Sequence, residues 1–195
     1  MTNKKTAYVF VLILTVILFF SLSCFRYYNL NLKYPDFRIF EHSIGEEIRG
    51  GDISIIATSC ELLDGKQTKL VQPNYEIDVR DQDGTFLDDD QVRNLIIHIK
   101  VINNTNIKQV ISFVNFYPES GAWTNGLSLE LYRLYNPYAG SPIEYNIDPD
   151  STNEIVLPYT MIYSQFKDGD WRKIEQRTFQ LVLSQYPVKH IINLC

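Results

Sequence analysis

Residues 94–104 read NLIIHIKVINN, and this stretch decides the fold class. Every second side chain is apolar on one face, whereas His98 and Lys100 fall on the other face. Strict alternation of this kind is typical of a β-strand that buries one side. The strand is expected to end at Asn103-Asn104, because asparagine pairs favour turns. The apolar face consists of Leu95, Ile97, Ile99 and Val101.

The same alternation recurs on both sides of this stretch. No segment beyond residue 45 has the spacing of a long amphipathic helix, although a short helical turn is expected near residues 168–176. Strand edges must be paired or closed, so the sequence predicts an all-β, two-layer β-sandwich of about seven or eight strands. The other expected strands cover residues 53–57, 75–79, 110–117, 127–131, 155–159, 179–184 and 188–194.

A run of 20 residues without charge, TAYVFVLILTVILFFSLSCF at 6–25, precedes the strands. About 20 apolar residues suffice for a helix to cross a bilayer. Lys4 and Lys5 stand before the run, and positive residues stay on the cytoplasmic side. We therefore expect a cytoplasmic stub at 1–5, a transmembrane signal anchor at 6–25, a spacer at 26–44 and an extracytoplasmic sandwich at 45–195.

Two other interpretations of the N-terminus are open. Ser21-Leu22-Ser23-Cys24 loosely resembles a lipobox, in which Cys24 would carry the lipid of a lipoprotein. The spacing of Ser21 and Ser23 also resembles a signal-peptidase site, which would release the domain. All three interpretations place the domain outside the cytoplasm.

The charge of the domain argues against nucleic acid as a partner. All four basic residues of the first 35 positions lie in or near the apolar run, so the remainder carries 14 basic and 23 acidic residues. A surface of this sign repels a polyphosphate backbone.

The densest acidic segment is EIDVRDQDGTFLDDD, residues 76–90. Calcium prefers several carboxylate and carbonyl oxygens that lie close together. A calcium site is therefore one alternative for this loop, and an ordinary solvated loop is the other. The candidate ligands are Asp81, Asp83, Asp88 and Asp90.

Two cysteines stand at the ends of expected strands, Cys60 after the first and Cys195 after the last. First and last strands are often neighbours in sandwiches, and extracellular thiols can form a disulfide when their Cα atoms come within about 7 Å. A Cys60–Cys195 disulfide and two unpaired thiols are both compatible with the sequence.

Catalytic motifs are missing from the sequence. The three histidines, His42, His98 and His190, lie in separate segments, and neither a G-x-S-x-G nor an H-E-x-x-H motif occurs. We therefore expect no enzyme, with a hydrolase that uses a dispersed site as an alternative.

Aromatic residues point instead to recognition. Tyr and Trp offer large contact areas at little entropic cost, so exposed examples are typical of binding surfaces. The candidate binding residues are Trp123, Asn125, Tyr135 and Tyr138. The alternative is that tyrosines cap the ends of sandwich strands.

Four short motifs stand in order along the domain: IGEEI at 44–48, VINNT at 101–105, PDS at 149–151 and FQLVLS at 179–184. They resemble a group of uncharacterised Gram-positive surface proteins with an immunoglobulin-like domain, and more broadly the telomeric-repeat-factor-like immunoglobulin domains of bacterial lipoproteins. The broader group usually has glycine where Asp150 stands. The resemblance covers about residues 44–194 and implies an immunoglobulin-like sandwich on the cell surface, with no established activity.

Together these features predict a single-pass protein of the cell membrane with an extracellular C-terminal domain. We expect a binding or accessory module whose partner is a membrane protein or a cell-wall component. The alternatives are a calcium-binding surface domain and a hydrolase, and the sequence implies no cofactor other than calcium.

Overall fold

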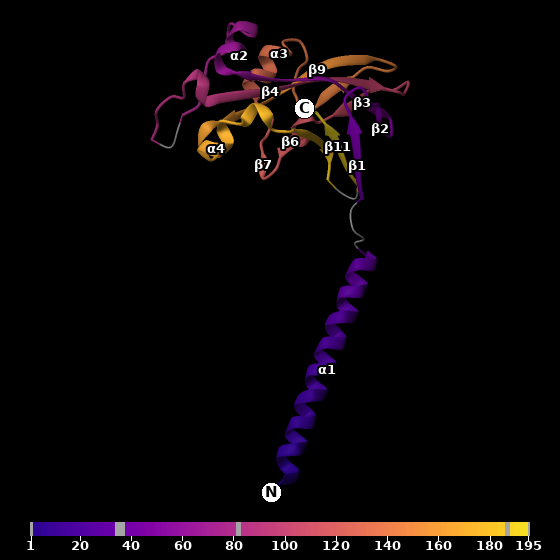
Figure 1. Ribbon diagram of the computed structural model, residues 1–195. Helices are drawn as coiled ribbons and strands as arrows, with labels where there is room; N and C mark the ends of the chain where they lie inside the picture. Colours follow the sequence, from indigo (N-terminus) through magenta and orange to yellow (C-terminus); the bar gives the residue numbers. More distant parts are fainter. Residues whose placement is uncertain (1, 34–37, 81–82, 186–187, 195) are drawn as a thin grey trace. The chain divides into compact units, whose positions relative to one another are not determined.

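The computed structural model describes residues 2–33, 38–80, 83–185 and 188–194. The chain divides into two units, residues 1–38 and residues 39–195. Figure 1 labels the principal elements of both units.

The first unit is the helix α1 (Thr2–Lys33). Among the described residues it is the one helix that is long and apolar enough to cross a membrane. Its large apolar side chains are broadly exposed, from Tyr8 at 76% to Leu32 at 65%. The helix extends past residue 25, where the charge-free run ends, because Leu30 and Leu32 continue its apolar composition.

The second unit is mainly β-structure arranged in two layers. One sheet has the order β2-β3-β4-β9 and consists of β2 (Ile48–Gly50), β3 (Ile53–Asp64), β4 (Val92–Asn103) and β9 (Thr152–Ile162). Residues 94–103 make up most of β4, which pairs antiparallel with β3 on one side and β9 on the other. Its central position explains why its alternation is so regular.

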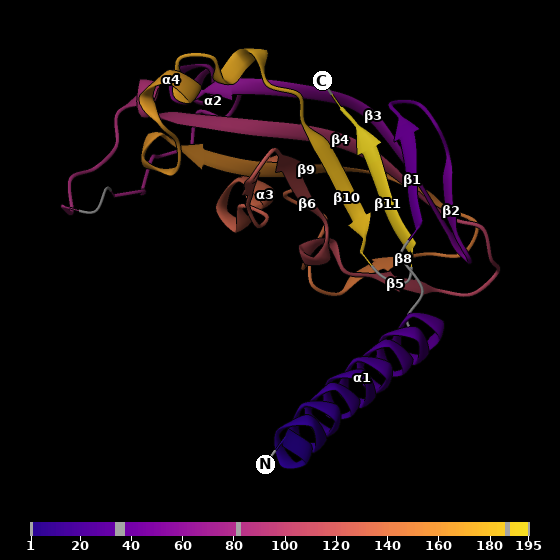
Figure 2. The ribbon, with the colours of Figure 1, turned by 60° about the horizontal axis from the view of Figure 1, so that its bottom comes forward.

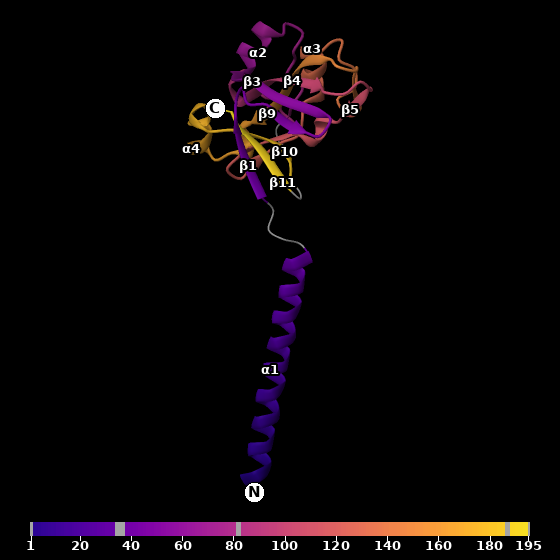
Figure 3. The ribbon, with the colours of Figure 1, turned by 90° about the vertical axis from the view of Figure 1, so that its right-hand side faces the viewer.

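The other main sheet has the order β1-β11-β10-β6-β7. Figures 2 and 3 show β1, β10 and β11 on one side of this unit and β3, β4 and β9 on the other. A third pair joins β5 (Gln109–Ile111) to β8 (Tyr145–Ile147). The strands of the second sheet are β1 (Arg38–Ser43), β11 (Val188–Asn193), β10 (Gln180–Ser184), β6 (Tyr117–Ser120) and β7 (Trp123–Thr124).

The hydrophobic core includes the inner faces of the two main sheets. Leu95, Ile97, Ile99 and Val101 are at most 1% exposed, as the alternation predicts. Leu181 and Ile192 of the second sheet belong to the same core and are fully buried. Burial of each such side chain stabilises the folded state by about 1.5–3 kcal/mol relative to leaving it exposed.

Several expected strands are wrong. Residues 127–131 fall mostly within a helix, α3 (Leu129–Tyr135), and residues 75–79 form no strand. The expected strand 110–117 is interrupted by a 3₁₀ turn, η2 (Phe113–Asn115). The described residues contain eleven strands rather than seven or eight, because several pairings involve only two or three residues.

The helix α3 forms because its segment covers the open edge of β9. The amide of Ser128 donates to the Pro158 carbonyl at 2.9 Å, and Asn136 exchanges hydrogen bonds with the backbone of Val156. Neighbouring Leu131 and Tyr132 are both fully buried, which suits one face of a helix but not the alternating faces of a strand.

Two other local expectations are settled by the structure. The short helical turn near 168–176 is confirmed as α4 (Asp168–Trp171) followed by η4 (Ile174–Gln176). Residues 26–44 were expected to lack regular structure, yet they contain the end of α1 and all of β1. The strand β1 forms because it adds to the edge of β11.

Candidate functional site

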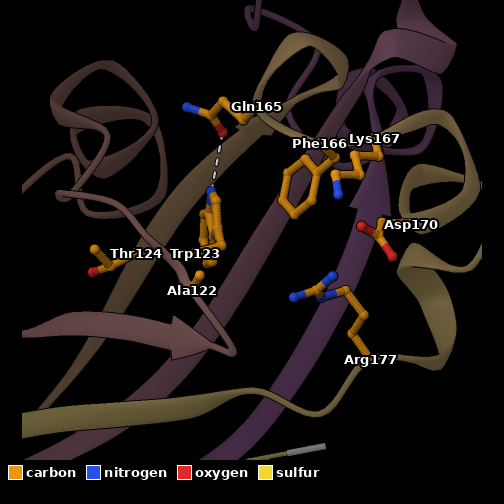
Figure 4. Close-up of a pocket in the computed structure, with 8 residues that line it drawn as sticks. All are labelled: Ala122, Trp123, Thr124, Gln165, Phe166, Lys167, Asp170 and Arg177. Atoms are coloured by element: carbon orange, nitrogen blue, oxygen red, sulfur yellow. Dashed lines mark hydrogen bonds between the residues drawn. The ribbon is translucent and has the colours of Figure 1, made fainter.

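The best candidate site is an open hollow of about 520 Å³ beside Trp123, called here the Trp123 hollow. Figure 4 shows its eight lining residues, which come from β7 and its approach, from the chain after β9, and from the chain before β10. The antiparallel pairing of β6 with β10 brings two of these segments together, and the third follows β9 of the other sheet. The lining residues are Ala122, Trp123, Thr124, Gln165, Phe166, Lys167, Asp170 and Arg177.

Trp123 forms the aromatic floor of the hollow. Its side chain packs against Phe166 and Phe179, each with a ring-centroid distance of 6.1 Å, and the residue is only 8% exposed. The indole Nε1 donates to Gln165 Oε1 at 3.0 Å, as Figure 4 shows. The tryptophan is thus fixed in place and presents part of its surface without needing a further hydrogen-bond partner.

Arg177 forms a rigid cationic wall. Its Nε donates to Ser120 Oγ at 3.1 Å, and its Nη2 donates to the Ser120 carbonyl at 2.7 Å. The guanidinium also lies over the ring of Phe166, 5.4 Å from the centroid. Gly121, with a φ of +61°, makes the turn that leaves room for it, since an added Cβ would lie 3.2 Å from Arg177 Nη2.

The remaining charges of the hollow are Lys167 and Asp170, both exposed. Two cations and one anion give the hollow a local positive charge within an acidic domain. A planar guanidinium that is already oriented suits a carboxylate or another flat anion, and the aromatic floor suits an apolar group beside it. The fixed guanidinium beside an aromatic ring equips the hollow for binding a ligand that has both an anionic and an apolar part.

The four predicted binding residues do not share one surface. Trp123 lines the hollow, whereas the Nδ2 of Asn125 donates to the Thr160 carbonyl at 2.6 Å and helps to cover the edge of β9. Tyr135 and Tyr138 line a different hollow of about 400 Å³, where Tyr138 is fully exposed. Recognition at all four residues by one small ligand would therefore require two separate hollows.

The carboxylates of the acidic loop interact with groups of the protein that lie close to them. Asp83 Oδ1 accepts from the Thr85 amide at 2.9 Å, and this contact is the main reason why the pKa of Asp83 is lowered. Asp88 caps the 3₁₀ turn η1 (Asp89–Gln91), and Asp89 pairs with Lys69 at 2.6 Å. Within the described ranges, no three acidic, histidine or cysteine side chains gather as metal ligands. Asp81 lies outside these ranges. The backbone carbonyl of Asp90 accepts a hydrogen bond from Arg93.

The cysteine predictions stay open. Cys60 is half-buried and packs against the core, whereas Cys195 lies outside the described residues. Cys24 is exposed on α1. The disulfide and the lipid attachment therefore remain predictions.

Sequence reasoning missed Phe166, Lys167 and Arg177 as partners of Trp123. These residues lie more than 40 positions from Trp123, and only the packed sandwich makes them neighbours: β6 pairs with β10, after Arg177, while Phe166 and Lys167 follow β9. The local signal that could have helped is Ser120-Gly121-Ala122, a tight turn immediately before the tryptophan.

Comparison with known proteins gives a family without a described activity. Residues 54–190 match the family model described as "Domain of unknown function (DUF5028)". No curated protein matches the chain.

Several solved structures are similar in fold. The yjhA protein from Bacillus subtilis is 14% identical, with a TM-score of 0.47, and the match covers 79% of this chain and 99% of that chain. An uncharacterised β-sandwich protein from Clostridium difficile 630 is 10% identical, with a TM-score of 0.45 and coverages of 82% and 97%. A putative lipoprotein, ycdA, from Bacillus subtilis subsp. subtilis is also 10% identical, with a TM-score of 0.43 and coverages of 76% and 38%.

Proposed function

We propose that this chain, which belongs to the DUF5028 family, is a membrane-anchored extracytoplasmic binding module without catalytic activity. In this proposal α1 crosses the cell membrane, residues 1–5 are cytoplasmic, and the sandwich lies outside. The Trp123 hollow carries the argument, because it combines a fixed guanidinium with an aromatic floor.

The proposed ligand bears an anionic group next to an apolar or aromatic portion. Arg177 and Lys167 would bind the anion, and Trp123 with Phe166 would contact the apolar portion. Such a group could belong to a neighbouring membrane protein, which would make the chain an accessory subunit, or to a component of the cell wall. The overall acidic charge would keep large polyanions away while the hollow accepts a small anionic group.

We also propose that the sandwich is related to immunoglobulin-like domains. The order β11-β10-β6-β7 corresponds to the G-F-C-C′ order of a variable-type sheet. The other sheet departs from the A-B-E-D order, because β2, β3 and β4 are neighbours both along the chain and across the sheet. The proposed relationship therefore concerns the sheet that carries the Trp123 hollow.

Site-specific photo-crosslinking tests the proposed site. A photoreactive residue replaces Thr124, at the rim of the hollow, in the full-length protein in native membranes; the matched control replaces Asn146, an exposed strand residue on β8. We expect a specific adduct from position 124 alone, weakened roughly tenfold by Lys167→Glu, because one charge reversal in a binding site is worth about 1.4 kcal/mol or more.

The identity of the adduct distinguishes a membrane-protein partner from a wall component. The same adducts from both positions, no adduct at all, or an adduct that Lys167→Glu leaves unchanged would each contradict the proposed site.

A further inference from the structure

The strand β1 is joined to β11 by a row of rings and charges that lies apart from the Trp123 hollow. The rings of Phe40, His190 and His42 follow one another, with centroid distances of 5.4 Å and 5.3 Å and interplanar angles below 20°. Glu46, in the turn after β1, continues the row. Figures 1 and 2 show β1 beside β11, running in the same direction at the edge of the sheet.

The contacts in this row are hydrogen bonds. His42 Nδ1 lies 2.8 Å from Glu46 Oε1, and His42 Nε2 lies 3.1 Å from His190 Nδ1. A carboxylate accepts hydrogen bonds, so His42 Nδ1 carries a proton and donates. The contact between the two rings then needs one further proton, which is held by either His42 Nε2 or His190 Nδ1.

We propose that Glu46, His42 and His190 form a proton-operated latch, which holds β1 on β11 near neutral pH and releases it in acid. When the two histidine rings together gain one proton beyond their neutral forms, the contact between them still has one donor and one acceptor, and Glu46 stabilises the resulting charge on His42. A second extra proton makes both rings imidazolium. Two N–H groups then face each other across the contact, and two like charges repel.

The direction of the pH effect follows from the state of each group. Partial burial, and the neighbouring His42 in second place, lower the pKa of His190. The released strand therefore binds the last proton more readily than the latched strand, and falling pH favours release. Hydrogen bonds from His42 and from the Ser43 amide lower the pKa of Glu46, so its charge persists through this range. The latch should open as the pH falls below about 6.5, the ordinary pKa of histidine.

The other charged groups around the latch are paired elsewhere. Glu41 on β1 accepts from Asn193 Nδ2 at 3.4 Å, and Lys189 on β11 binds Glu119 of β6 at 2.6 Å. On β10, the Ser184 hydroxyl oxygen accepts a hydrogen bond from the backbone amide of His190 at 3.3 Å. A metal ion between the rings would need more protein ligands than the two histidines, and the described part of the chain supplies no third.

Release would alter the link between the two units of the chain. The strand β1 is the first strand after α1, which ends at Lys33. Freeing its six residues would lengthen the connecting chain by about 20 Å when extended. It would also uncover the edge of β11, which could then pair with another strand.

Hydrogen exchange of the full-length protein in detergent tests the latch. The peptide that covers β1 is followed at about pH 7.5 and about pH 5, with correction for the intrinsic exchange rate, both without and with chelator. We expect its protection to fall at least about tenfold in acid, while β4 and β9 stay protected and show that the sandwich remains folded.

Three variants complete the test. His190→Phe keeps a ring against Phe40 but cannot be protonated, so the protection of β1 should no longer fall in acid. Glu46→Gln removes the charge that stabilises protonated His42, so release should move to higher pH. His98→Phe, on β4, should behave like the natural protein.

Three results would overturn the proposal. One is unchanged protection of β1 in acid, and another is an acid effect that survives in His190→Phe. The third is loss of protection at neutral pH on adding chelator, which would mean that a metal rather than a proton joins the two histidines.

Discussion

At the scale of single residues, Asn103 joins three parts of the chain. Its Nδ2 donates to the carbonyls of Ile107 and Asp148, and its Oδ1 accepts from the amide and hydroxyl of Thr105. Asn103 itself is 1% exposed, so its amide group makes these hydrogen bonds with little access to water. The next residue, Asn104, is exposed and donates to Ser54 Oγ.

Replacing these two asparagines should have unequal effects. We expect Asn103→Ala to lower the free energy of unfolding by about 2–3 kcal/mol, because it removes several hydrogen bonds made by one buried amide, including the bond to the buried Ile147 carbonyl. Asn104→Ala should cost less than about 1 kcal/mol, since water can replace its single contact. Urea unfolding followed by tryptophan fluorescence measures both. Equal losses would contradict the role assigned to Asn103.

The same pair shows what can be predicted at this scale. The sequence indicates a turn at Asn103-Asn104, and the structure confirms that β4 ends at Asn103. The division of roles between the two residues depends on β8 and the chain after it, which lie more than 40 residues away. Asp150 is similar: its place in a turn is visible in the sequence, but its left-handed φ of +51° is known only from the structure.

At the scale of elements, the acidic loop is the clearest case for a direct test. Adding calcium at about millimolar concentration should leave the melting temperature unchanged, because the candidate ligands already have partners. Asp83 accepts a hydrogen bond from Thr85, Asp88 caps η1, and Asp89 pairs with Lys69. The measurement is thermal unfolding of the full-length protein, with magnesium as the control. A calcium-specific rise in the melting temperature, lost in Asp83→Asn, would instead favour the calcium-binding alternative.

Which elements could be predicted depends on their position in the sheets. The strand β4 lies between β3 and β9 in its sheet. Its apolar side chains alternate because one face of that sheet packs on the core, so the predicted strand is confirmed. The residues around Leu129 also alternate, but they cover the edge of β9 and form a helix instead. Short edge strands such as β1 are stabilised by the neighbour they join, and their own residues carry only a weak signal.

At the scale of the whole molecule, the Trp123 hollow exists only because three distant segments meet. The sequence indicates Trp123 as a recognition residue, but it contains nothing that pairs this residue with Phe166 or Arg177. Antiparallel pairing of β6 with β10, with Pro118 opposite Leu181, joins two of the segments, and the third follows β9. The charge and shape of the site therefore follow from the topology of the sandwich and not from any local stretch of sequence.

The membrane attachment is also a property of the whole molecule. We expect that protein extracted from membranes has the intact mass of the unmodified chain, with the N-terminal segment retained. The reason is that the charge-free run is long enough for a helix to span a bilayer and that Lys4 and Lys5 precede it. Apolar side chains exposed along the whole helix also need a lipid surrounding, which a spanning helix provides.

The matched variant is Cys24→Ser, which should remain in the membrane fraction to the same extent as the natural protein. Retention should be lost when three charged residues are placed at Leu14, Ile17 and Leu18, because each charge at the centre of a spanning helix costs about 2.5–3.5 kcal/mol. A chain that begins at Cys24 and carries a lipid, or a Cys24→Ser protein that leaves the membrane, would instead identify a lipoprotein. A soluble chain that lacks the first 23 residues or more would identify a secreted domain, and the latch at β1 would then regulate a free N-terminal arm.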